Sequence, residues 1–295
     1  MEVILMAGES TKFVFWDVQH GSSTYINTPN GKNIVLDLGT GSYEYGKSFS
    51  PLIHLKKKHN ISHLDWVIIS HPHKDHIDDI MNFDELSPSV FSRPRNIPKE
   101  LVMSKTRDQD KELFEKYFEI DDRYNSPISN MNNLKKPINS GGVVVQTFYS
   151  KSNHTANINN YSIVTVLSYA GQKVILPGDN EPPSWEKLLE NNSFVKAITG
   201  KGILLAPHHG RESGFYDEIF DYFSPYLTIV SDGKWCDTSA TDRYSNLSEG
   251  WLVYYRNGER EKRYCLTTRK DGYVVVKIGY TNDRTKPYIN IKARG

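Results

Sequence analysis

Short apolar runs separated by turn residues dominate the first seventy positions of the chain. Phe13-Val-Phe-Trp-Asp-Val and Asn33-Ile-Val-Leu-Asp-Leu are rich in β-forming residues, and Thr28-Pro-Asn-Gly lies between them. This order predicts a β-hairpin. The pattern next predicts a helix over residues 50–59 and a buried strand over residues 64–70.

The second half of the chain repeats the strand-rich pattern. Further strands are expected at residues 143–149, 161–167, 173–176, 202–206, 226–230, 251–255 and 273–278. Residues 82–140 are polar and proline-rich, with one helical stretch at 108–119, which indicates an insertion over the site rather than core. Two strand-rich halves with intervening helices predict an α/β protein, a four-layer αββα sandwich. We expect a single domain over residues 1–295, with a partly helical insertion at about 82–140.

Composition narrows the class of protein. Hydrophobic residues make up 38% of the 295 positions, as in ordinary globular chains, and the formal net charge of +1 is too low for a nonspecific nucleic-acid coat protein. No run approaches the roughly eighteen apolar residues of a membrane span, and residues 1–6 are too short and acidic for a signal peptide. We therefore expect a cytoplasmic protein without membrane contact. Cys236 and Cys265 form no C-x-x-C pair and are expected to be structural.

Four side chains that can bind metal occur within six residues, directly after the strand expected at 64–70. The segment reads His71-Pro-His73-Lys-Asp75-His76. Alternate residues of an extended loop point the same way, so His71 and His73 could hold one ion while Asp75 and His76 turn toward a second. Imidazole and carboxylate together suit Zn, Mn or Fe in a binuclear hydrolytic site. The alternative is a histidine-rich surface loop.

This segment resembles the H-x-H-x-D-H motif of the metallo-β-lactamase superfamily. Leu176-Pro-Gly-Asp179 is similar to the family's segment with a bridging aspartate, and Leu204-Leu-Ala-Pro-His208-His209-Gly210 is similar to its late histidine segment. These pieces follow in the family's order and span residues 13 to about 232. The resemblance implies the αββα metallo-β-lactamase sandwich.

Within the superfamily, the chain is most similar to the ComEC-type branch, the soluble hydrolase domain of DNA-uptake proteins and its stand-alone relatives. Phe15-Trp-Asp17-Val-Gln-His20-Gly21 and Asn159-Asn-Tyr-Ser-Ile-Val carry this likeness. The chain departs from the branch at Ser22, where an acidic residue is usual, and at Asp78-Asp79, where Gly-Gly is usual.

The resemblance also implies the ligands of two divalent ions, Zn or Mn. The expected set is His71, His73, Asp75, His76, Asp179 and His208, with His154 as a candidate for the family's middle histidine. Asp179 would bridge both ions, and His208, in preference to His209, would complete the second site. Asp75 and Asp179 are the expected catalytic residues, because either could orient the attacking water. His20 could approach the site from the early loop.

These groups permit hydrolysis by a metal-activated water, and the ComEC-type likeness favours a phosphodiesterase or nuclease acting on nucleic acid or a small phosphodiester. Candidate phosphate contacts are Lys56, Lys57, Lys58, Arg93, Arg95, Lys234, Arg243 and the charged run 256–263, which otherwise reads as a solvated hairpin. The alternatives are hydrolysis of a small ester, lactone, thioester or β-lactam, and a metal-stabilised binding module without turnover. A basic groove beside the ions would favour nucleic acid, and a closed cavity under residues 82–140 would favour a small molecule.

Overall fold

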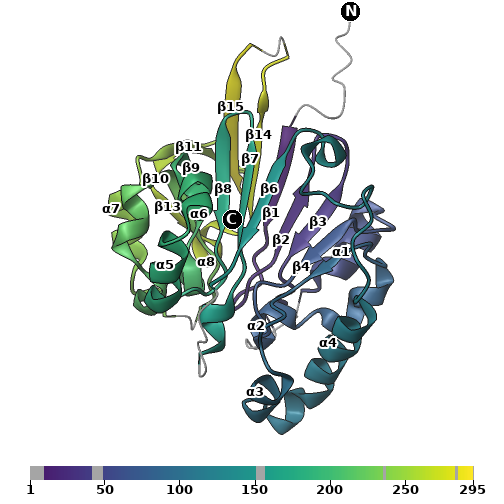
Figure 1. Ribbon diagram of the computed structural model, residues 1–295. Coiled ribbons are helices and arrows are strands. Elements are labelled where there is room, and N and C mark those ends of the chain that lie inside the picture. Colours follow the sequence, from purple (N-terminus) through teal and green to yellow (C-terminus); the bar gives the residue numbers. More distant parts are fainter. Residues whose placement is uncertain (1–9, 42–48, 151–156, 235–236, 283–284, 295) are drawn as a thin grey trace, which may run out of the picture.

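The chain folds into two β-sheets packed face to face, with helices covering the outer faces (Figure 1). The computed structural model describes residues 10–41, 49–150, 157–234, 237–282 and 285–294. The four-layer αββα sandwich expected from the sequence is thereby confirmed. No helix within these described ranges is long and apolar enough to cross a membrane.

The larger sheet combines strands from both ends of the chain. In spatial order it contains β12 (Arg260–Arg263), β11 (Trp251–Tyr254), β15 (Pro287–Ala293), β14 (Val274–Tyr280), β1 (Ser10–Phe15), β2 (Thr24–Asn27), β3 (Asn33–Leu36), β4 (Trp66–Ile68) and β5 (Phe91–Ser92). The smaller sheet contains β13 (Cys265–Thr267), β10 (Phe223–Val230), β9 (Gly200–Leu205), β8 (Gln172–Leu176), β7 (Val164–Tyr169) and β6 (Val144–Phe148). The expected strands are therefore present, whereas β2, β5, β13 and β15 were not predicted. The hairpin expected between the first two apolar runs is corrected, because β2 pairs with both β1 and β3 and the turn at 28–31 joins β2 to β3.

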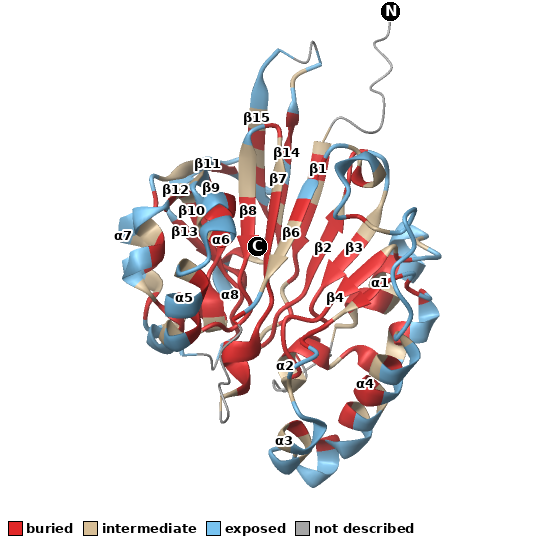
Figure 2. Cartoon of the chain, viewed as in Figure 1, coloured by how far each residue is buried: buried red, intermediate tan, exposed pale blue. Residues whose placement is uncertain are grey.

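Three apolar clusters hold the layers together. The central cluster fills the space between the sheets, with Phe13 and Trp66 from one sheet facing Leu176 and Leu227 from the other. The outer clusters lie beneath the helices, so the strands are largely buried while the helices expose their outward sides (Figure 2). The helices are α1 (Pro51–His59), α2 (Lys74–Ile77), α3 (Lys99–Ser104), α4 (Lys111–Arg123), α5 (Pro182–Leu189), α6 (Asn192–Ile198), α7 (Thr241–Leu247) and α8 (Thr268–Asp271).

Local chemistry explains where several elements begin and turn. The Ser50 side chain accepts a hydrogen bond from the backbone N–H of Ile53 and caps α1, whose first residue is Pro51. Ala170 and Gly171 join β7 to β8, and both have positive φ angles, of 50° and 73°. Such a two-residue loop matches the twist of the flanking strands.

Residues 82–140 form part of the hydrophobic core. The sequence had predicted that this segment lies over the site as an insertion outside the core. The edge strand β5 pairs in parallel with β4. Phe114, Tyr117 and Ile120 of α4 are buried in the cluster on the outer face of the larger sheet. The sequence did not indicate this contribution, because prolines and polar residues dominate the segment and the apolar face of α4 contains only a few residues.

The loops that carry the candidate ligands leave both sheets at one edge. In the larger sheet β3 and β4 run parallel, and in the smaller sheet β8, β9 and β10 run parallel. Carboxyl ends of parallel strands meet at the same edge, so the loops after β4, β8 and β9 converge there. Figure 1 shows α2, which follows the histidine motif, at this end of the strands.

Candidate metal centre

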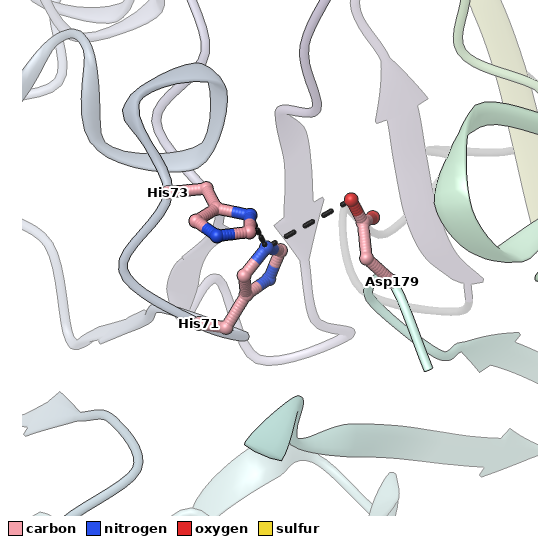
Figure 3. A group of neighbouring side chains, drawn as sticks. All are labelled: His71, His73 and Asp179. Carbon is pink, nitrogen blue, oxygen red and sulfur yellow. Dashed lines mark hydrogen bonds and ion pairs between the residues drawn. The ribbon is translucent and has the colours of Figure 1, made fainter. Parts of the chain in front are cut away.

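The first group of candidate ligands joins the histidine loop to the loop after β8. His71, His73 and Asp179 each offer one ligand atom, and these atoms lie within 4.8 Å of one another. His71 Nε2 is 2.9 Å from His73 Nδ1 and 3.8 Å from Asp179 Oδ2 (Figure 3). Metal bonds of about 2.1 Å place the ligands of one ion roughly 3–4 Å apart, so this spacing suits a shared cation.

The second group lies directly beside the first. Asp75, His76 and His209 place their ligand atoms within 4.8 Å of one another. Asp179 reaches this group as well, because its Oδ1 is 3.3 Å from His76 Nε2 and its Oδ2 is 3.7 Å from His209 Nε2. One carboxylate therefore faces both groups, which is the arrangement predicted for a bridging aspartate.

Two histidines of the second group are oriented by partners behind them. His76 Nδ1 donates to Asp37 Oδ2 at 2.9 Å, and His209 Nδ1 donates to the Ser231 carbonyl at 3.0 Å. Both Nε2 atoms are buried and face carboxylates: His76 Nε2 lies 3.3 Å from Asp179 Oδ1, and His209 Nε2 lies 3.2 Å from Asp75 Oδ2. A metal-binding histidine typically has this arrangement, in which one ring nitrogen is anchored and the other faces the ion. The residues present therefore fit a metal pair.

The charge balance of the centre supports the same conclusion. Burial alone would raise the pKa of the Asp179 carboxyl, but His76, His209 and His71 hold it well below its usual range. Burial would also raise the pKa of the Asp75 carboxyl, but hydrogen bonds from His20 and His209 hold it well below its usual range. Two buried carboxylates thus stay ionised and need cations beside them. Burial lowers the pKa of His71 well below its ordinary value, which keeps that ligand neutral.

The Asp179 loop is held in place by residues 159–164. Ser162 Oγ accepts a hydrogen bond from the Asp179 backbone N–H at 3.1 Å, and Asn180 Nδ2 donates to the Ser162 carbonyl at 3.1 Å. Asn159 Nδ2 donates to Glu181 Oε1 at 3.0 Å. The asparagine-rich segment therefore positions the loop that presents Asp179.

The early loop contacts the metal centre through its backbone and through His20. The Ser22 N–H donates to the Asp75 carbonyl at 3.1 Å, so Ser22 contacts the histidine loop through its backbone. His20 Nε2 lies 3.2 Å from Asp75 Oδ2, and the His20 side chain is 26% exposed. His20 thus reaches the site from its open side, as the sequence allowed.

His209, and not His208, lies in the second ligand group, although the sequence favoured His208 for that position. His209 joins Asp75 and His76, whereas His208 belongs to neither group: its Nε2 is 4.0 Å from Asp179 Oδ2, and its Nδ1 is 3.2 Å from Glu181 Oε1. Both histidines have left-handed backbones, with φ angles of 48° and 55°. With this uncommon backbone the two side chains have different partners, and the sequence alone does not predict such a conformation.

Several other candidates have structural partners or lie outside the description. His154 and Cys236 fall outside the described residues. Burial raises the pKa of the Cys265 thiol to about 12, as suits a structural cysteine. Arg243 pairs with Glu212 and Asp217. The charged run forms an exposed β11–β12 hairpin, as predicted.

Asp37 was missed by the sequence analysis. It follows β3, is fully buried and has a φ angle of 59°, which is uncommon for a residue other than glycine. Its carboxylate accepts hydrogen bonds from the Ser70 backbone N–H at 2.7 Å, from Ser70 Oγ at 2.9 Å and from His76 Nδ1. The sequence feature that could have indicated Asp37 is its position as an acidic residue directly after an apolar strand.

Replacing Asp37 with asparagine should weaken divalent metal binding by about 10- to 100-fold, because the partner that orients His76 is altered. The metal affinity of the stripped protein is measured by titration. Asp65→Asn is the matched control, since Asp65 also accepts a backbone and a side-chain hydrogen bond, from Asn33 and Lys32, away from the site. Equal affinities for the two variants would contradict the role given to Asp37.

The chain matches no family model and no curated protein. Among solved structures it is similar to CmlA, a diiron β-hydroxylase from Streptomyces venezuelae, with 12% identity and a TM-score of 0.41 over 76% of this chain and 45% of that chain. A mutant of the CmlA β-hydroxylase gives 11% identity and a TM-score of 0.42 over 91% and 54%. The chain thus spans about half the length of these solved chains. Similarity at this level does not indicate a shared activity.

Proposed function

We propose that the chain is a metal-dependent hydrolase of the metallo-β-lactamase superfamily that cleaves phosphodiesters. The observation that carries this proposal is the pair of adjacent ligand groups with Asp179 facing both. When bound, two divalent ions such as Zn or Mn supply Lewis acidity and an activated water at neutral pH. The histidine and carboxylate donor set suits such ions.

The proposed ligands follow the geometry. His71, His73 and Asp179 would hold the first ion, and Asp75, His76, His209 and Asp179 the second. Asp75 and Asp179 would also orient the attacking water, because both carboxylates stay ionised and belong to the ligand groups. We place His208 beside the first ion, since it lies near Asp179 and is held by Glu181.

A cationic groove at the same edge of the larger sheet favours a phosphodiester over a neutral ester. This groove has a volume of about 640 Å³, and its lining includes Arg93, Arg95, Arg123 and Lys135 and no carboxylate among the residues that the structure describes. Ile163, another lining residue, donates its backbone N–H to the Ser70 carbonyl, so the groove adjoins the histidine loop.

Two of these cations are available to a substrate. Arg93 and Arg123 pair with Asp121 and Asp84. Arg95 donates to the Tyr124 carbonyl and Lys135 to the Thr147 hydroxyl, so neither is neutralised by a carboxylate within the described part of the chain. Uncompensated cations beside hydroxyl groups suit phosphate oxygens.

The test is hydrolysis of bis-p-nitrophenyl phosphate by the metal-stripped protein, titrated with Mn²⁺ and Zn²⁺. We expect metal-dependent turnover that is lost in the Asp75→Ala, His76→Ala double variant. In the Arg95→Gln, Lys135→Gln variant, KM should rise about tenfold or more with kcat retained, since charge-assisted contacts are worth about 1.5–3 kcal/mol.

Two outcomes would overturn the proposal. Metal-dependent turnover of p-nitrophenyl acetate without any turnover of the phosphodiester would make the chain an esterase of another class. Tight metal binding with no turnover of either substrate would make it a binding module.

A further inference from the structure

A second pocket lies on the outer face of the larger sheet, beside α1. It has a volume of about 470 Å³, and β1, β14 and β15 supply its floor. The metal groups lie instead in the loops at the carboxyl ends of the strands. One part of the pocket is cationic and another is aromatic, and none of the residues of the metal groups lines it.

The cationic part contains four side chains, three from neighbouring strands and one from the residue that follows β15: Lys12, Lys277, Lys292 and Arg294. Lys12 stands directly opposite Lys277 in the antiparallel register, and Val275 stands opposite Lys292. Like charges facing each other across two strands repel, and this destabilises the sheet. Burial, together with Lys277 and Arg294, lowers the pKa of Lys12.

These cations have no ion pair with any carboxylate in the described ranges. Among the described residues that line the pocket, Asp17 is the one acidic residue, and it accepts a hydrogen bond from Gln19 Nε2 at 3.0 Å. An uncompensated group of four cations is therefore a site for an anion of more than one charge.

The aromatic part is built around Trp16. The Trp16 ring lies 5.3 Å from the Phe49 ring and 5.9 Å from the Tyr273 ring, and Tyr273 is 38% exposed. The Trp16 side chain is 5% exposed, and its Nε1 is buried with no hydrogen-bond partner among the described residues. A buried indole N–H usually finds an acceptor, so this donor indicates a missing polar partner.

We propose that this pocket binds a nucleotide, with the base against Tyr273 and Trp16 and the phosphates against the four cations. A flat ring joined to a polyanion matches both parts of the pocket, and the volume suits one small ligand. Inorganic phosphates lack the ring, and nucleosides lack the charge. The nucleotide is either free or the phosphorylated end of a strand, and the two sources share this chemistry. The site does not depend on the proposed hydrolysis.

The test is calorimetric titration of the full-length, metal-stripped protein in EDTA with ATP, adenosine, inorganic triphosphate and a 5′-phosphorylated oligonucleotide. We expect ATP or the oligonucleotide to bind at least tenfold more tightly than adenosine or triphosphate. The tighter of the two identifies the source of the nucleotide. Affinity should be unchanged in the Asp75→Ala, His76→Ala variant, which separates this site from the metal centre.

Substitutions within the pocket make the assignment specific. Lys277→Gln combined with Arg294→Gln, and separately Tyr273→Ala, should each weaken nucleotide binding at least tenfold, whereas Lys57→Gln on the exposed side of α1 should not. The Lys277→Gln, Arg294→Gln variant should keep or raise its unfolding temperature, because it removes repulsion between like charges. No saturable binding, affinity unaffected by these substitutions, or triphosphate binding as tightly as ATP would overturn the proposal.

Discussion

Replacing Asp179 with asparagine should reduce metal-dependent hydrolysis by about a thousandfold or more, since metal ions supply several kcal/mol of transition-state stabilisation and each 1.4 kcal/mol is a factor of ten. The substitution would keep the shape of the side chain but remove the negative charge that faces both ligand groups. Both ions should bind more weakly, because the amide offers only one neutral oxygen. The metal content after dialysis and the rate with saturating metal are measured together.

The control for this prediction is Asp217→Asn, which changes an exposed aspartate paired with Arg243 at the surface. It should retain the metal content and rate of the native protein. If Asp179→Asn held two ions and kept its rate within threefold of native, Asp179 would not be a bridging ligand.

Replacing Gly178 with alanine should abolish metal binding, because it displaces the loop that presents Asp179. Gly178 has a φ angle of 62°, and an added Cβ would lie 2.8 Å from Ser70 Cβ and 2.9 Å from Ser162 Cβ. The left-handed backbone alone costs a residue other than glycine about 1–2 kcal/mol. The contact with Ser70 and Ser162 adds to this cost and pushes apart the histidine loop and the Asp179 loop.

Gly171→Ala separates these two effects. Gly171 has a φ angle of 73°, but an added Cβ would meet nothing within 4 Å. Chemical denaturation should show a loss of about 1–2 kcal/mol for Gly171→Ala, with native metal binding. Gly178→Ala should lose more stability and also its metal affinity. Indistinguishable behaviour of the two variants would rule out a role for the close packing at Gly178.

The parts of the fold that the sequence predicted are those with strong local signals. Apolar runs bounded by turn residues marked most strands, and Ser50 with Pro51 marked the start of α1. The candidate ligands from the H-x-H-x-D-H segment were also found, because their residue types suit metal and their spacing is short. Asp179 was found through the resemblance of its segment to the one in the metallo-β-lactamase superfamily. The structure brings these five side chains together.

The features that the sequence did not predict depend on contacts between distant segments. Asp37 supports His76 from 39 residues away, and no local pattern links them. The choice between His208 and His209 depends on backbone angles and on the Ser231 carbonyl, which lies beyond the next strand. β15 pairs on one side with its sequence neighbour β14. On its other side, β15 pairs in parallel with β11, a strand well before it in the sequence.

The position of β1 sets an order of events during synthesis of the chain. β1 pairs on one side with β2, its neighbour in sequence, and on the other with β14, where Ser10 meets Gly279. While the chain emerges from the ribosome, this second edge of β1 has no partner until β14 has been made, and such an edge is prone to aggregation. Pairing between remote segments also slows folding. Every proposed metal ligand is therefore translated before the sheet that holds the histidine loop can close.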